Sequence, residues 1–194
     1  MAHGTRLRSR LSGALLALAG WRVRVEPLPG PKGVVIVYPH TSNWDFPVGY
    51  LFKLATGLPL SWVGKDTLFR WPVGVLLRRM GGIAANRRER TGLIGQLVGE
   101  FRRRDWMWMA IAPEGTRSLA PHWKSGFHRL ALAADVPVGL AFIDWGRREV
   151  GVCGYVRMTG DRDADMARIG AAYAGKMGLR PENAGPIRLG DDDR

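Results

Sequence analysis

Residues 33–38, Gly-Val-Val-Ile-Val-Tyr, are the feature that most restricts how this chain can fold. β-Branched side chains favour strands over helices. Neighbouring side chains of a strand point to opposite faces of its sheet, so a strand without charged residues must be covered on both faces. The run therefore predicts a central strand in a sheet that has helices on both sides.

Short apolar runs alternate with helix-like stretches along the rest of the chain. The expected strands are residues 21–26, 60–63, 82–86, 106–112, 137–145 and 149–158. The expected helices are residues 46–57, 66–80 with an interruption at Pro72, 91–104, 126–134 and 163–177. Strands that alternate with helices are typical of a parallel sheet. The sequence therefore predicts one α/β domain over residues 21–178, with a mixed, mostly parallel sheet flanked by helices.

The two ends of the chain differ from this domain. Arg6, Arg8 and Arg10 precede an apolar stretch of about ten residues, which is too short to span a bilayer. Residues 1–20 fit an amphipathic membrane anchor or a plain N-terminal helix. A signal peptide is a third, disfavoured interpretation, because nothing downstream resembles a secreted protein. Prolines and an aspartate run predict a mobile tail over residues 179–194.

The overall charge restricts the class of partner. Lysine and arginine total 29 against 17 acidic residues, a formal net charge of +12. This surplus favours nucleic acid, an anionic lipid surface, or an acidic substrate or carrier. The basic residues are spread along the chain and no nucleic-acid motif is present, which disfavours nucleic acid. The single cysteine, Cys153, excludes an intramolecular disulfide and predicts a reducing compartment.

His40 and Asp45 follow the predicted central strand directly. Open α/β sheets bind ligands at the carboxyl ends of such strands. Five positions apart, the two side chains would not face each other on a helix, so they meet only if His40 lies in the turn and Asp45 begins the helix. Pro47 supports that boundary, because proline is tolerated in a first helical turn. The pair is then a general base with its orienting carboxylate, although a structural turn histidine beside a helix cap also fits the spacing.

A second polar loop, Glu114-Gly115-Thr116-Arg117-Ser118, follows the apolar strand expected at residues 106–112. Gly115 allows close backbone approach to a ligand, and the guanidinium fork of Arg117 suits a phosphate. Lys124 and Gly126 follow this loop and are expected to border the same site. His128 is expected on a helix surface.

Together these two loops resemble the glycerolipid acyltransferase family, which includes the 1-acylglycerol-3-phosphate acyltransferases. His40, Ser42 and Asp45 match the family's His-x-Ser-x-x-Asp block, and residues 114–117 match its Glu-Gly-Thr-Arg block. Two weaker blocks follow the family's order, at residues 82–87 and 136–138. The resemblance runs from about residue 33 to residue 145 and implies that residues 21–178 form an acyltransferase domain.

The resemblance implies a role for each matching residue. His40, oriented by Asp45, would deprotonate the hydroxyl of a lysophospholipid such as 1-acylglycerol-3-phosphate. Arg117, with Gly115 and Thr116, would bind the acceptor's phosphate. Arg87 would be a second phosphate contact, with its neighbour Arg88 an open alternative, and Glu114 is associated with acceptor binding. The donor would be acyl-CoA or acyl carrier protein, and no metal or prosthetic group is implied.

Alternative functions remain open at this stage. The acceptor could be another lipid or a glycolipid, and a thioester hydrolase could use the same histidine with water as acceptor. A basic nucleic-acid-binding protein is the disfavoured alternative from another class. The expected location of the enzyme is peripheral, on the cytoplasmic face of a membrane, because the resemblance implies a lipid acceptor and the single cysteine predicts a reducing compartment.

Overall fold

The computed structural model describes residues 2–85 and 90–190. Its strands are β1 (Arg22–Arg24), β2 (Lys32–Tyr38), β3 (Leu60–Lys65), β4 (Gly82–Ala85), β5 (Met107–Ile111), β6 (Val138–Asp144) and β7 (Glu149–Val156). Its helices are α1 (Ala2–Leu18), α2 (Asp45–Thr56), α3 (Val73–Arg79), α4 (Arg90–Arg103), α5 (Gly126–Ala134) and α6 (Arg162–Ala172), with short 3-10 helices η1 (Asp66–Phe69) and η2 (Pro181–Asn183).

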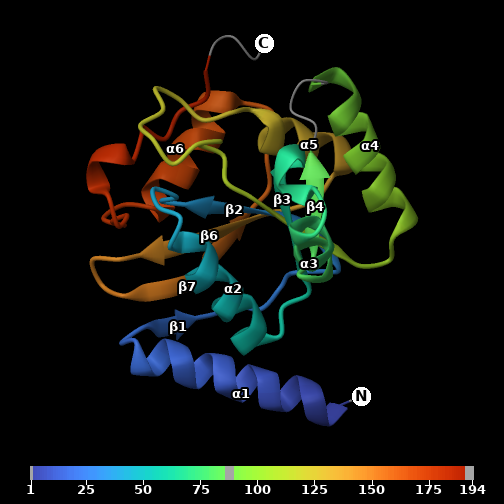
Figure 1. Ribbon diagram of the computed structural model, residues 1–194. Coiled ribbons are helices and arrows are strands. Elements are labelled where there is room, and N and C mark those ends of the chain that lie inside the picture. The colour runs from blue at the N-terminus through green and yellow to red at the C-terminus, as the bar shows by residue number, and fades with distance from the viewer. Residues whose placement is uncertain (1, 86–89, 191–194) are drawn as a thin grey trace.

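The strands form one sheet in the order β1-β7-β6-β2-β5-β3-β4. Neighbouring strands are parallel except for β6 and β7, which are antiparallel. Helices α4, α5 and α6 cover one face of the sheet, and α1 and α2 cover the other (Figure 1). The prediction of a mixed, mostly parallel sheet between helices is confirmed.

Strand β2 lies in the middle of the sheet and contributes to both cores, as its composition predicted. Val34 and Ile36 are fully buried against residues of α4, α5 and α6. Val35 points to the opposite face, where it packs with Leu16 of α1 and Phe52 of α2. Because β2 is covered on both sides, the loop that follows it starts from a rigid position.

Helix α1 spans most of the predicted N-terminal segment and packs along α2 (Figure 1). Leu16 is buried in this contact, and the hydroxyl of Ser9 donates a hydrogen bond to the carbonyl of Ala55. Over residues 2–85 and 90–190, no helix combines the length and apolar character that crossing a membrane requires.

Helix α6 ends five residues before the predicted end, at Ala172. Gly175 follows in a left-handed conformation, with φ at 72°, which a right-handed helix cannot contain. The chain then returns to the sheet, where the backbone N–H of Trp145 donates to the carbonyl of Met177.

Residues 179–190, which were predicted to belong to a mobile tail, instead pack against the domain. The backbone N–H of Arg180 donates to Thr41 Oγ1, and Leu189 forms a parallel bridge with Trp123. Ala184, Ile187 and Leu189 pack against the core on the α4–α6 face of the sheet. Their spacing has neither helical nor strand periodicity, so the local pattern does not reveal that the folded domain provides them with an apolar surface. Residues 191–194 lie outside the described residues.

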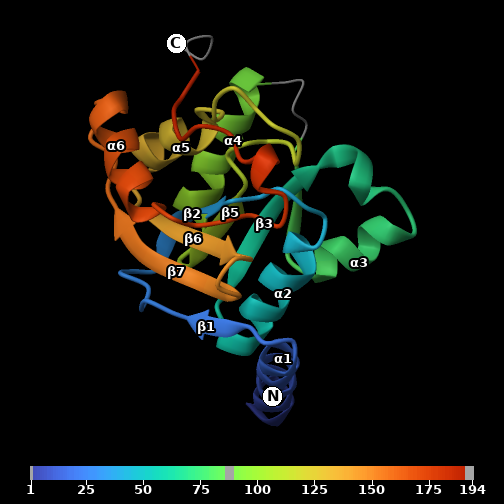
Figure 2. The same ribbon diagram turned by 90° about the vertical axis from the view of Figure 1, so that its left-hand side faces the viewer.

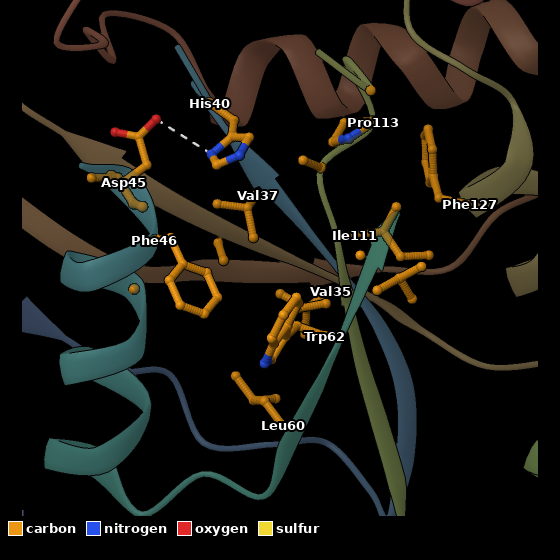
Figure 3. Close-up of a pocket in the computed structure, with 18 of the residues that line it drawn as sticks. Val35, Val37, His40, Asp45, Phe46, Leu60, Trp62, Ile111, Pro113 and Phe127 are labelled. Carbon is orange, nitrogen blue, oxygen red and sulfur yellow. Dashed lines mark ion pairs between the residues drawn. The ribbon is translucent and has the colours of Figure 1, made fainter. Parts of the chain in front are cut away.

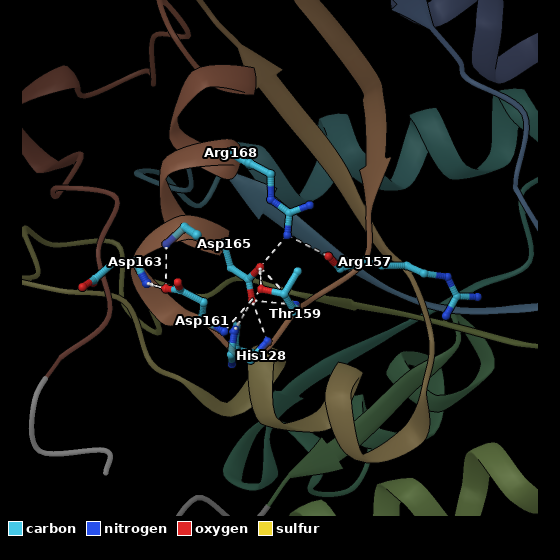
Figure 4. A network of polar contacts seen from close by, with 9 residues as sticks. His128, Arg157, Thr159, Asp161, Asp163, Asp165 and Arg168 are labelled. Atoms are coloured by element: carbon cyan, nitrogen blue, oxygen red, sulfur yellow. Dashed lines mark hydrogen bonds and ion pairs between the residues drawn. The ribbon is translucent and has the colours of Figure 1, made fainter.

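The prediction that His128 lies on a helix surface is wrong. Its side chain is buried, and Nε2 lies 2.8 Å from Oδ2 of the fully buried Asp165 in α6 (Figure 4). Asp165 also accepts hydrogen bonds from the backbone N–H and the hydroxyl of Thr159 and from Arg168. Burial alone would raise the pKa of Asp165, but these contacts outweigh it and lower the pKa to about 2. The network links α5 to α6 and to the loop after β7.

Replacing Asp165 with Asn should destabilise the fold by about 3 kcal/mol, because it leaves buried partners without their countercharge. A carboxyl group whose pKa is lowered on folding adds stability above its unfolded value and loses it as the pH falls. The wild type should therefore lose about 2 kcal/mol between pH 4 and pH 2. Urea unfolding at several pH values tests this, with exposed Asp163→Asn as the matched control. Equal stability of Asp165→Asn and the control at pH 7 would contradict the prediction.

Candidate active site

His40 lies in the turn between β2 and α2, and Asp45 is the first residue of α2, as the spacing required. Nδ1 of His40 is 3.3 Å from Oδ2 of Asp45, an ion-pair contact slightly longer than an ordinary hydrogen bond (Figure 3). The His40 side chain is 17% exposed and that of Asp45 is 1% exposed. With Nδ1 turned to the carboxylate, Nε2 is left to face a substrate.

Asp45 is held from three directions. Besides facing His40, it accepts a hydrogen bond of 2.8 Å from the backbone N–H of Ser42 and another of 2.8 Å from the indole Nε1 of Trp145. Burial raises the pKa of Asp45, but the hydrogen bonds from His40, Ser42 and Trp145 outweigh it and the net pKa is lowered. Asp45 is therefore ionised at neutral pH and can stabilise an imidazolium at His40.

Trp145 is a site residue that sequence reasoning missed. It follows β6 directly, next to β2 in the sheet, which brings its indole within reach of Asp45 from 100 positions along the chain. The sequence offers one signal for Trp145, which is its position at the end of an expected strand.

Glu114 contacts the backbone of His40 and does not line the cavity. The residue is 3% exposed, and its Oε2 accepts a 2.8 Å hydrogen bond from the backbone N–H of His40. Burial and the charge of Asp45 raise the pKa of Glu114 to about 7, against hydrogen bonds from the backbones of His40 and Gly185. This geometry gives Glu114 contact with the turn that carries the histidine, whereas the family resemblance associates it with the acceptor.

A cavity of about 970 Å³ opens beside His40. Figure 3 shows His40 at one end and apolar side chains extending away from it. These side chains come from β2, α2, β3, β5 and α5, and include Val35, Val37, Phe46, Leu60, Trp62, Ile111 and Phe127. A long apolar space with a base at one end can hold a fatty chain while its carboxyl end reaches the histidine.

The loop after β5 forms a polar rim on this cavity. Gly115, Thr116 and Arg117, which the sequence predicted to bind substrate, line it together with Lys124 and Gly126. Gly115 has a φ of 69°, and a Cβ atom there would lie 2.9 Å from the Lys124 side chain. Both facts favour glycine at this position. The guanidinium of Arg117 and the hydroxyl of Thr116 are exposed at the rim, where a phosphate could bind.

The fold thus brings His40, Asp45, Gly115, Thr116 and Arg117 to one end of the cavity. Glu114 does not line the cavity but contacts the backbone of His40. Arg87 and its alternative Arg88 lie outside the described residues. The two loops meet because β2 and β5 are adjacent parallel strands, so their carboxyl ends share one edge of the sheet.

The fold and the site together define an α/β enzyme with a histidine–carboxylate base at the mouth of an apolar cavity. A family model described as Acyltransferase matches residues 21–139, and the chain belongs to the Acyltransferase family.

Similarity to a solved structure extends over most of the fold. The crystal structure of PlsC from Thermotoga maritima, a 1-acyl-sn-glycerophosphate acyltransferase, aligns with a TM-score of 0.56 and 17% sequence identity. The alignment covers 86% of this chain and 75% of that chain, so the two proteins share a fold. Comparison with curated protein sequences finds no match.

Replacing Glu114 with Ala should lower kcat for acyl transfer roughly 100-fold, because the turn that positions His40 loses its buried anchor. The KM for the acceptor should change little, because Glu114 does not line the cavity. Glu114→Gln retains a carbonyl oxygen for the His40 N–H and should keep most of the activity. Steady-state kinetics of both variants test this, and a raised acceptor KM with unchanged kcat would instead support direct acceptor binding.

Proposed function

We propose that this acyltransferase moves a fatty acyl group from acyl-CoA or acyl carrier protein to the hydroxyl of a lysophospholipid such as 1-acylglycerol-3-phosphate. The observation that carries the proposal is that His40 and the exposed Arg117 line the same, largely apolar cavity. The cavity suits the acyl chain, and Arg117 suits the phosphate of the acceptor. The acceptor hydroxyl then lies between them, at the histidine.

The chemical step follows from this arrangement. Nε2 of His40 takes the proton of the acceptor hydroxyl while the oxygen attacks the thioester carbonyl carbon. The new carbon–oxygen ester bond forms, the carbon–sulfur bond breaks, and the leaving thiolate takes the proton back from the imidazolium. Asp45 stabilises the imidazolium through Nδ1. The reaction needs no acyl-enzyme intermediate.

His40→Ala should lower transfer by roughly 10²- to 10⁴-fold, the usual contribution of a general base. Release of free thiol from acyl-CoA, measured with and without lysophosphatidate, provides the test. His122→Ala is the matched control, because His122 does not line the cavity. Full activity of His40→Ala would rule out this mechanism, and thiol release that does not need the acceptor would support a thioester hydrolase instead.

We also propose that the enzyme works at a membrane surface, peripherally and on the cytoplasmic face. Helix α1 supports this, because the face opposite its contact with α2 exposes a stripe of leucines. Leu7, Leu11, Leu15 and Leu18 are 54–86% exposed and recur at helical spacing. Arg6, Arg8 and Arg10 flank the stripe on both sides, and all three are exposed. Such a helix suits an interface, with leucines among acyl chains and arginines at anionic headgroups.

A second apolar patch supports the same proposal. It covers η1, α3 and the turn between them, and Figure 2 shows α2 between this region and α1. Trp71 is 85% exposed and Leu76 is 60% exposed, and the exposed Arg70 and Arg79 accompany them. Leu68 belongs to this patch and also lines the cavity, so a membrane bound here would lie next to the place where a lipid enters.

Replacing Leu11 and Leu15 together with Gln should weaken binding to vesicles of phosphatidylcholine and phosphatidylglycerol roughly 10- to 100-fold, because two leucines no longer enter the apolar layer. Co-sedimentation with vesicles measures the effect. The control is Leu132→Gln, which replaces an exposed leucine of α5 outside both patches. Transfer to lysophosphatidate in detergent micelles should stay unchanged in both the double variant and the control. Unweakened vesicle binding would contradict the proposed role of α1.

A further inference from the structure

A second, smaller pocket lies beside the catalytic turn. Its volume is about 160 Å³, and its lining residues are Thr41, Ser42, Asn43, Trp44, Arg117 and Arg180. Arg117 and Asn43 line both this pocket and the large cavity, so the two spaces are neighbours. Arg180 comes from the segment after α6 and lies outside every sequence block that indicated the site.

The charge of this pocket is positive and uncompensated. Both Arg117 and Arg180 are exposed, and neither has an ion-pair partner within residues 2–85 and 90–190. By contrast, Arg157 is paired with Asp135 and Arg168 with Asp165. The acid nearest in sequence to the lining residues, Asp45, is buried and already accepts from Ser42 and Trp145.

The rest of the lining suits an anion as well. Thr41, Ser42 and Asn43 are neutral, and their hydroxyl and amide groups are hydrogen-bond donors. Two guanidinium forks and neutral donors in one lining suit the oxygens of a phosphate monoester, which carries close to two negative charges at neutral pH.

The backbone of Arg180 is held against the catalytic turn. Its N–H donates a 3.2 Å hydrogen bond to Thr41 Oγ1. Two residues earlier, the chain passes so close that a Cβ atom on Gly178 would lie 2.5 Å from the same oxygen. Arg180 therefore has a fixed starting point next to the loop that carries His40, unlike an arginine on a free tail.

We propose that Arg180 and Arg117 together form the binding site for the phosphate of the acceptor, in the small pocket, while the acceptor hydroxyl lies at His40. The site recognises a phosphate monoester, and a phosphate of an acyl-CoA donor has similar chemistry, so the experiment separates these two sources. This inference rests on the proposed transfer to a lysophospholipid and adds Arg180 to the residues proposed to bind its phosphate.

Arg180→Gln tests the proposal through kinetics in detergent micelles. The KM for lysophosphatidate should rise roughly 10- to 100-fold, because a charged hydrogen-bond donor is lost, while kcat changes far less. The preference for lysophosphatidate over monoacylglycerol, its phosphate-free counterpart, should fall by a similar factor. The KM for acyl-CoA should not change. Arg180→Lys keeps the charge without the guanidinium fork. Its KM for lysophosphatidate should therefore lie between those of the wild type and Arg180→Gln.

Arg102→Gln is the matched control, because Arg102 is exposed on α4 and its removal changes the net charge equally. A raised KM for acyl-CoA in Arg180→Gln, with that for lysophosphatidate unchanged, would overturn the proposal and assign the pocket to the donor. Unchanged KM values for both substrates would also overturn it.

A binding measurement separates this inference from the proposed function. If the wild type transfers no acyl group to lysophosphatidate, the proposed function fails. Calorimetry with lysophosphatidate in micelles then decides the phosphate site by itself. Binding roughly tenfold or more weaker in Arg180→Gln than in Arg102→Gln supports the site. Equal binding in the two variants, or no binding to the wild type, rejects it.

Discussion

The hydrogen bond from the backbone N–H of His40 to the buried carboxylate of Glu114 joins the two loops that form the site. One loop follows β2 and the other follows β5, which are adjacent and parallel. The sheet brings the loops to the same edge, but a shared edge alone does not fix the position of a turn. Because the bond acts on the backbone of the histidine, it positions the whole residue and leaves the imidazole for chemistry. The polar rim of the cavity follows Glu114 directly in sequence, so His40 and the rim are positioned together.

The two carboxyl groups on either side of His40 have opposite electrostatic environments. Hydrogen bonds lower the pKa of Asp45, whereas burial and the charge of Asp45 raise that of Glu114 to about 7. Two full negative charges this deep in the protein would repel each other strongly. Asp45 keeps its full charge, on the side of His40 Nδ1. Glu114 carries a partial charge at neutral pH and serves as an anchor.

The cavity is lined from both faces of the sheet. Helices α4, α5 and α6 cover one face, where Trp123 and Tyr173 are fully buried. Helices α1 and α2 cover the other face, and the exposed leucines of α1 lie on that side. The lining of the cavity includes Phe46 of α2 and Phe127 of α5. The space beside His40 therefore depends on the packing of both helical layers.

Local sequence determined much of this protein. The apolar run at residues 33–38 predicted the central strand, and the spacing of His40 and Asp45 was consistent with a turn before a helix. Residues 114–117 predicted a second polar loop after a buried strand. These features depend on backbone periodicity and turn chemistry, which neighbouring residues encode.

Tertiary structure alone decided which distant groups meet. It buried His128 against Asp165, placed Trp145 on Asp45, and turned Glu114 toward the histidine instead of the cavity. It also folded the expected tail back so that Arg180 meets Thr41, 139 positions earlier in the chain. Burial and partner choice depend on how separate segments pack, and no local pattern of residues carries that information.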